Sequence, residues 1–207
     1  MTQQGATLYY ISKHVFNFDR IYGYLKESGF LIKHPDTQLI TGLAEEGDLN
    51  ETSLEKVKEL ILNQDDIGIH LWLENGQKMF WSFSTYGNYF SYNFDFISLL
   101  DSDQIEEEIS PFFIKLALSE LYIEENNFLG FTLDQYGNSE WNDFGEIFDR
   151  ENKNILNHSY ISEITFLPKN MISKITLDNK SRIININKNF DCIARDEKLA
   201  ASLEGKL

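Results

Sequence analysis

The clearest alternation of apolar and polar positions lies in residues 67–94, where apolar runs are separated by two short turn signals. Asn75-Gly76 suits a two-residue type I′ hairpin turn, because both residues tolerate the positive φ that its central positions need. Gly87-Asn88 suits a second tight turn, with glycine first as a type II′ turn prefers. The stretch therefore predicts a three-stranded antiparallel meander.

These two turns also predict which side chains share a face. A two-residue loop at Asn75-Gly76 places His70 opposite Trp81, and the second turn places Trp81 opposite Phe94. The shared face then holds His70, Trp72, Met79, Trp81, Phe83, Phe90, Tyr92 and Phe94. Aromatic side chains bury about 150–250 Å² each, so this face must be covered, whereas we expect the other face to be partly solvated.

Apolar residues at helical spacing predict three further helical regions. One runs from Phe18 to a glycine cap at Gly29, and one follows Thr52-Ser-Leu-Glu55, which has the spacing of a capping box. The third region, in residues 101–121, contains Pro111, which suits the first position of a helix, so two segments should meet there. Strands are predicted over residues 8–11, 30–33, 37–43 and 128–133.

From Tyr160 the chain is rich in Ile, Thr and Asn, with turn signals at Pro168-Lys-Asn170 and Asp178-Asn-Lys180. We interpret this region as a second meander, followed by a frayed or helical tail. The predicted fold class is α+β, with antiparallel β-meanders and helices packed on one face. Residues 1–207 should form a single compact domain, with a possible subdivision near 151–159.

The 207 residues, 42% of them hydrophobic and 14% aromatic, can bury an ordinary core. Cys192 is the single cysteine, which excludes an internal disulfide and a zinc site built on thiolates, and which fits a reducing cytoplasm. The first residues lack a signal-peptide pattern, and no run approaches the roughly 20 apolar residues that cross a bilayer. We expect a cytoplasmic protein that does not bind membranes.

The net charge of −15 argues against binding nucleic acid through its phosphates. The charge is unevenly spread. Residues 1–100 hold 7 Lys/Arg and 13 Asp/Glu (net −6), residues 101–151 hold 2 and 14 (net −12), and residues 152–207 hold 9 and 6 (net +3). The segment 101–151 is therefore the acidic pole of the chain.

The sequence offers little support for an enzyme. Its four histidines are far apart and form no zinc motif, and no glycine-rich phosphate loop follows a predicted strand. Cys192 has no histidine nearby and is expected to be a small buried apolar residue. We therefore predict no catalytic residues, no metal and no cofactor, and we favour a protein that is not an enzyme.

The acidic segment also carries aromatic residues, and this combination suits a protein-binding surface because charge steers a partner and aromatic residues anchor it. Other carboxylates of this segment, Glu120 and Asp134 among them, are expected to contribute to the same surface. The predicted partner-binding residues are Glu124, Glu125, Tyr136, Glu140, Trp141, Asp143, Glu146 and Asp149. The opposing interpretation is that the charge serves solubility and that Trp141 belongs to the core.

In composition and architecture the whole chain resembles the immunity proteins of bacterial toxin systems. These are acidic, single-domain α+β proteins without enzyme motifs, often with aromatic-rich sheets, and each binds a cognate toxin. The resemblance implies a protein that inhibits a basic, toxin-like or nuclease-like partner. It rests on no diagnostic motif, so it assigns no residue a role, and it leaves open whether the chain is a monomer or a dimer.

Two alternatives remain at the level of the sequence. A small-ligand module or enzyme could use a pocket on the aromatic face, formed by His70, Trp72, Trp81 and Tyr92, where burial would perturb the histidine pKa. The less specific interpretation of His70 is a core or sheet-rim histidine. A DNA mimic would need carboxylates spaced like phosphates along an elongated body, and ranks last.

Overall fold

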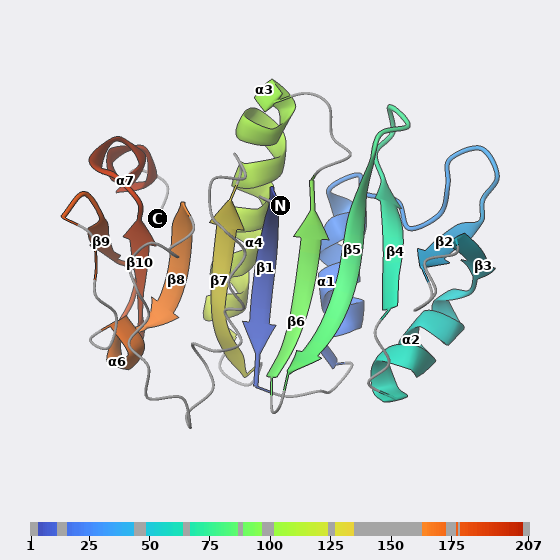
Figure 1. Cartoon of the computed structure of the whole chain (residues 1–207), viewed down its shortest axis with the longest axis horizontal. Coiled ribbons are helices and arrows are strands. Elements are labelled where there is room, and N and C mark those ends of the chain that lie inside the picture. The colour runs from blue at the N-terminus through green and yellow to red at the C-terminus, as the bar shows by residue number, and fades with distance from the viewer. Residues whose placement is uncertain are drawn as a thin grey trace.

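The computed structural model describes residues 4–11, 16–43, 49–63, 67–86, 89–96, 102–123, 127–134, 163–172, 177 and 179–204. Ten strands in these ranges form one antiparallel sheet, in the order β3-β2-β4-β5-β6-β1-β7-β8-β10-β9 (Figure 1). The strands are β1 (Gly5–Tyr10), β2 (Ile40–Leu43), β3 (Leu49–Thr52), β4 (Ile67–Trp72), β5 (Lys78–Tyr86), β6 (Tyr89–Asp95), β7 (Phe128–Asp134), β8 (Ile164–Pro168), β9 (Arg182–Asn185) and β10 (Phe190–Ala194). The predicted α+β class is confirmed.

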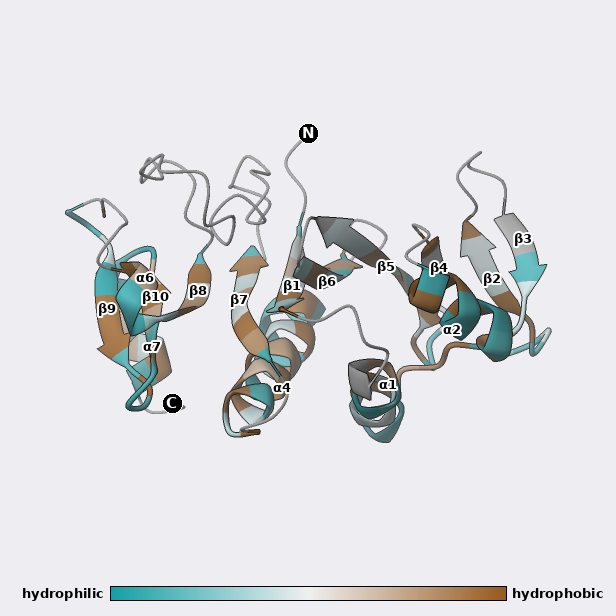
Figure 2. Ribbon diagram, turned by 90° about the horizontal axis from the view of Figure 1, so that it is seen from below, coloured by the Kyte–Doolittle hydropathy of each residue, from teal (hydrophilic) through white to brown (hydrophobic). Residues whose placement is uncertain are grey.

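Helices cover mainly one face of this sheet, which we call the helix-covered face. They are α1 (Phe16–Glu27), α2 (Leu54–Asn63), α3 (Ser102–Gln104), the π-helical segment η1 (Ile105–Ile109), α4 (Ser110–Leu121), α6 (Lys169–Ile172) and α7 (Glu197–Glu204). Figure 2 shows α1 and α4 on the same side of the sheet. Val57 of α2 and Leu203 of α7 join the same apolar core, whereas Ile172 of α6 packs in a smaller cluster on the opposite face.

The N-terminal strand β1 lies in the middle of the sheet, between β6 and β7. It pairs with β6 from Gly5 opposite Asp95 to Tyr10 opposite Phe90, and with β7 along its other edge. β7 in turn pairs with β8, so the sheet is continuous across the chain. The predicted subdivision near 151–159 lies outside the described residues, but the strands on either side of it share one sheet.

Local sequence explains how the helices begin and end. After α1, Gly29 has φ +88° and Phe30 N–H donates to the Leu25 carbonyl, as in a Schellman cap. The predicted capping box is displaced by one residue, because the Ser53 hydroxyl, and not that of Thr52, accepts the Lys56 N–H. Pro111 opens α4 as predicted, and the turn before it is π-helical, which suits a proline that lacks an N–H and crowds the preceding carbonyls.

Predicted strands differ from the structure at three places. Residues 30–33 form only a single bridge, Leu31 to Trp72. β3, at Leu49–Thr52, lies where no strand was predicted. The prediction of a second meander after Tyr160 is wrong, because the strands are not in chain order. β10 lies between β8 and β9, because the chain leaves β8 through α6 instead of a tight turn and reaches the sheet again at the edge.

Aromatic rings build the core between α1, α4 and the central strands. Trp81 is fully buried and stacks on Phe18 of α1, with ring centroids 5.2 Å apart, and on Phe94 of β6 at 5.6 Å. Phe94 also contacts Phe113 of α4 at 4.5 Å. One continuous set of ring contacts therefore joins two helices to the meander. Among the described residues, no helix is both long enough and apolar enough to cross a membrane.

Candidate functional site

The eight residues predicted to bind a partner all lie outside the described residues. These are Glu124, Glu125, Tyr136, Glu140, Trp141, Asp143, Glu146 and Asp149. The structure therefore describes only part of the acidic segment, namely residues 102–123 and 127–134, the second of which contains β7. The surface has to be built from this part.

The described part of the acidic segment presents a run of exposed carboxylates on η1. Ile105 and Ile109 point into the core, and the three residues between them, Glu106, Glu107 and Glu108, are exposed. Gln104 Nε2 donates to Glu108 Oε2 at 3.4 Å, but no described lysine or arginine forms an ion pair with any of the three. Three adjacent negative charges are thus left facing solvent.

Two carboxylates of the segment do not belong to this surface. Glu120 is fully buried and Asp134 is 5% exposed, so the expectation that both add to an exposed acidic surface is wrong. The Glu120 side chain lies in the core, where it accepts hydrogen bonds from Arg20 and Tyr10. These two side chains serve the fold instead.

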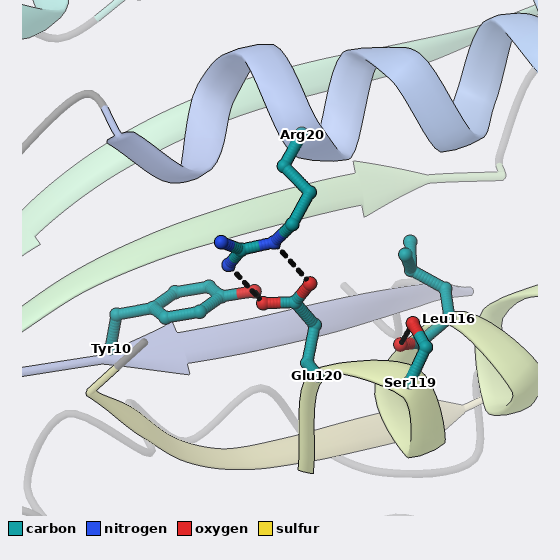
Figure 3. A network of polar contacts seen from close by, with 5 residues as sticks. All are labelled: Tyr10, Arg20, Leu116, Ser119 and Glu120. Atoms are coloured by element: carbon teal, nitrogen blue, oxygen red, sulfur yellow. Dashed lines mark hydrogen bonds and ion pairs between the residues drawn. The ribbon is translucent and has the colours of Figure 1, made fainter. Parts of the chain in front are cut away.

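Glu120 is the centre of a buried polar network that joins α4, α1 and β1 (Figure 3). Arg20 Nε and Nη2 donate to the two Glu120 oxygens at 2.8 and 2.6 Å, and Tyr10 Oη donates to Glu120 Oε2 at 2.9 Å. Burial and the adjacent carboxylate raise the pKa of Tyr10 well above its ordinary value, and the hydrogen bond from Arg20 to Glu120 raises the pKa of Arg20. Sequence spacing gave no signal for this network, because Glu120 is 100 residues from Arg20 and 110 residues from Tyr10.

The structure does not bring the predicted pocket residues together. The observed register pairs Ile69 with Trp81 and His70 with Phe80, one residue away from the predicted register. The cause is the turn: Gly76 has φ +81°, and its N–H donates to the Leu73 carbonyl, so the loop has three residues and not two. A shift of one residue moves every side chain of a strand to the other face.

Trp81 and Tyr92 consequently remain on the helix-covered face, while His70 and Trp72 lie on the opposite face. Trp81 and Tyr92 are both fully buried, and burial raises the pKa of Tyr92 well above its ordinary value. The second predicted register is confirmed, since Trp81 pairs with Phe94 and Phe83 with Tyr92. The aromatic core is therefore closed by helices at these positions and does not form a pocket with His70.

On the opposite face, His70 and Trp72 belong to a cluster of rings and cationic groups. The Trp72 ring centroid lies 4.3 Å from that of His34 and 5.7 Å from that of His70, and Lys78 Nζ lies 5.6 Å from it. His70 also contacts the Phe80 ring at 6.1 Å. We call His34, His70, Trp72, Lys78 and Phe80 the Trp72 cluster. Burial, and then the charge of Lys78, lower the pKa of His70.

A row of polar side chains crosses the middle of the same face. Asn93 pairs with Ser82 and with Thr7, Thr7 pairs with Thr132, and Thr132 pairs with Thr165. All of these except Ser82 are buried, and the Thr165 hydroxyl has no hydrogen-bond partner among the described residues. The solvated outer face that the sequence predicted is polar in composition, but its centre is not exposed.

A cluster of metal-ligating side chains would be a further kind of candidate site in the described part of the chain. No three His, Cys, Asp or Glu side chains there lie close enough to hold a metal ion. Cys192 is fully buried, as predicted, and burial raises the pKa of its thiol to about 12, so the nucleophilic thiolate is strongly disfavoured at neutral pH.

No protein-family model matches this chain, and searches of curated proteins and of solved structures found no match either.

Proposed function

We propose that this chain is an acidic binding protein that neutralises a basic protein partner by covering its active surface, as the immunity proteins that it resembles do. The exposed carboxylates Glu106, Glu107 and Glu108, which form no ion pair with a described lysine or arginine, support this proposal. They open a segment with 14 acidic and 2 basic residues. Such a concentration of like charge accelerates encounter with an oppositely charged protein and disfavours acidic competitors.

The fold gives these carboxylates a rigid support. η1 continues directly into α4, and α4 is held to α1 and β1 by the Glu120 network. A surface that is already ordered before binding loses little conformational entropy when the partner docks. Under this proposal the protein acts in the cytoplasm, and its partner is a toxin-like or nuclease-like protein with a basic active surface.

The first test is to identify the partner by its charge. Immobilised protein is exposed to a lysate of the source cell at low salt, and bound proteins are eluted with a salt gradient. The proposal predicts a basic protein whose activity is inhibited when the purified chain is added back. Retention of acidic or neutral proteins only, or binding without inhibition, would contradict it.

The second test localises the contact with matched charge reversals. The double variant E106K/E107K should weaken binding of the purified partner at least tenfold, chiefly through a slower association rate, and the loss should shrink at high salt. The control E51K/E204K makes the same change in net charge at two exposed carboxylates outside the acidic segment, and should change the affinity by less than about threefold. Equal effects of the two variants would show that only the total charge matters.

Charge reversal at Glu124, Glu125, Asp143 or Glu146 extends this test along the sequence of the acidic segment. Each change should weaken the same complex if the partner contacts the segment as a whole. An affinity that responds to none of these substitutions and to no change of salt would exclude the acidic segment as the binding surface.

A further inference from the structure

The Trp72 cluster is built by three segments that meet on the face opposite the main helices. β4 contributes His70 and Trp72, β5 contributes Lys78 and Phe80, and His34 comes from the turn after Leu31, which bridges to Trp72. Leu31 N–H donates to the Trp72 carbonyl at 2.8 Å and Trp72 N–H donates back at 2.7 Å. The position of His34 against the indole is therefore set by backbone hydrogen bonds.

His34 is also fixed in its ring orientation. Its Nδ1 atom accepts the backbone N–H groups of Asp36 and Thr37 at 3.1 and 3.4 Å. In the neutral imidazole the proton is then on Nε2, which acts as a donor. The His34 and Trp72 rings meet at an interplanar angle of 68°, with their centroids 4.3 Å apart.

Lys78 supplies a charge to the same place. Its ammonium lies over the Trp72 ring, and it forms no ion pair with a carboxylate of the described chain. His70 likewise makes ring contacts but no hydrogen bond to a described residue. Except for His70, which is 9% exposed, the members of the cluster are partly exposed. The cluster therefore combines partly exposed donors and a cation with aromatic surface, and no described carboxylate forms an ion pair with that cation.

We propose that the Trp72 cluster is a docking surface for a protein segment in which an aspartate or glutamate stands next to an apolar residue. The carboxylate would accept hydrogen bonds from Lys78 and His34, and the apolar neighbour would pack on Trp72 and Phe80. A polyanion such as nucleic acid offers the same negative charge, but the net charge of −15 repels a chain of phosphates. A single carboxylate carried by a protein is the ligand that this charge balance favours.

This inference does not depend on the proposed function. A basic partner would bind the acidic segment, whereas the Trp72 cluster selects a carboxylate, so the two surfaces call for opposite charges. Each can therefore be present without the other.

Two short peptides test the proposal. Acetyl-Ser-Phe-Glu-Ser-amide carries the expected pair of groups, and acetyl-Ser-Phe-Gln-Ser-amide differs from it only in the charge. Nitrogen-15 spectra of the whole protein resolve indole N–H signals, and the variant W72F identifies that of Trp72. We expect the Glu peptide to shift the Trp72 signal in the millimolar range and leave the Trp81 signal unchanged, and the Gln peptide to bind about tenfold more weakly.

A pair of lysine variants completes the test. K78M keeps the apolar stem over the indole and removes the charge, so it should weaken the Glu peptide about tenfold and abolish the preference over the Gln peptide. K58M is the control, because Lys58 also lies over an aromatic ring, that of Phe18, on the other side of the sheet, but is ion-paired with Asp19. Equal shifts with both peptides, no shift at all, or unchanged binding to K78M in a normally dispersed spectrum would each overturn the proposal.

Discussion

Glu120 is the residue whose surroundings most clearly decide its role. A buried carboxylate is tolerated only when its charge is balanced and its oxygens are hydrogen-bonded, and here Arg20 and Tyr10 satisfy both oxygens. The side chain of Arg20 is 28% exposed, so the pair is open to water from one side only. The network fixes the relative positions of α1, α4 and β1 rather than offering a reactive group.

Replacing Glu120 by glutamine should therefore be strongly destabilising. E120Q leaves Arg20 without its counter-charge, and we expect the free energy of unfolding to fall by about 3 kcal/mol, near the lower end for breaking a buried pair because Arg20 still reaches water. Urea unfolding measures this change. E59Q, which breaks the exposed Lys56–Glu59 pair, is the control and should cost less than about 1 kcal/mol. Similar costs for both variants would mean that the network contributes little.

His70 should make stability depend on pH in a defined direction. Its pKa in the folded protein is below the ordinary value of 6.5, whereas the unfolded chain keeps that value and so binds a proton first. The free energy of unfolding should then fall as the pH drops below about 6.5, and level off below the folded pKa. The variant H70N lacks this pH-dependent contribution of His70 to the free energy of unfolding. The difference in unfolding free energy between the parent and H70N should therefore become smaller from pH 7 to pH 5. A constant or growing difference would contradict the assignment.

Gly76 shows how far residue-level signals reach. Asn75-Gly76 correctly marked a hairpin turn, but the same dipeptide fits a two-residue loop and a three-residue loop with glycine in the left-handed position. The choice between them depends on which face of β4 packs better, and Ile69 and Leu71 are buried in preference to His70 and Trp72. The prediction of a pocket was wrong because the predicted β4–β5 register differs from the observed one by one residue.

At the scale of elements, sequence signals were most reliable where a local motif and the apolar pattern agreed. Gly29 ended α1 and Pro111 opened α4 as expected, because caps act within one turn of the chain. The order β8-β10-β9 was not predictable, because it depends on contacts between strands that are distant in sequence. Nor could the pattern show that Glu120 lies inside, since its partners come from other elements.

In the β4–β5 pair the Phe80 ring packs closely against Gly68, and this contact can be tested. A methyl group at Gly68 would lie 1.8 Å from Phe80 Cζ, so the ring that covers this glycine must move in G68A. We expect G68A to cost about 1–2 kcal/mol of unfolding free energy through this clash. In the F80A background the same substitution should be neutral or stabilising, because alanine loses less entropy than glycine in a strand. A double-mutant cycle measures the coupling, and purely additive effects would exclude the contact.

At the scale of the whole molecule, the central position of β1 joins the two halves of the sheet. It pairs with β6 on one edge and β7 on the other, so neither half has a complete set of neighbours without it. A shared strand of this kind favours one cooperative unfolding unit.

Probes in the two halves should therefore report a single transition. Trp81 lies in the meander, and Cys192 lies in β10, three strand positions beyond β1; both are fully buried. We expect the urea midpoint from Trp81 fluorescence, measured in a variant with Trp72 and Trp141 replaced by phenylalanine, to equal that from labelling of the Cys192 thiol in the same variant. Labelling of Cys192 at clearly lower urea would show that the C-terminal strands form a separate unit.

The position of β1 also has a consequence for how the protein is made. The ribosome produces β1 before both of its neighbours, β6 and β7, which end at Asp95 and Asp134. At synthesis rates of roughly 5–20 residues per second, β1 waits on the order of ten seconds before both are available. Until β6 has been made, a strand with Leu8 and Tyr10 on one side has no neighbour to pair with. Central placement of this strand thus leaves its apolar side and both of its edges uncovered while the chain grows, which is the kind of surface that promotes aggregation.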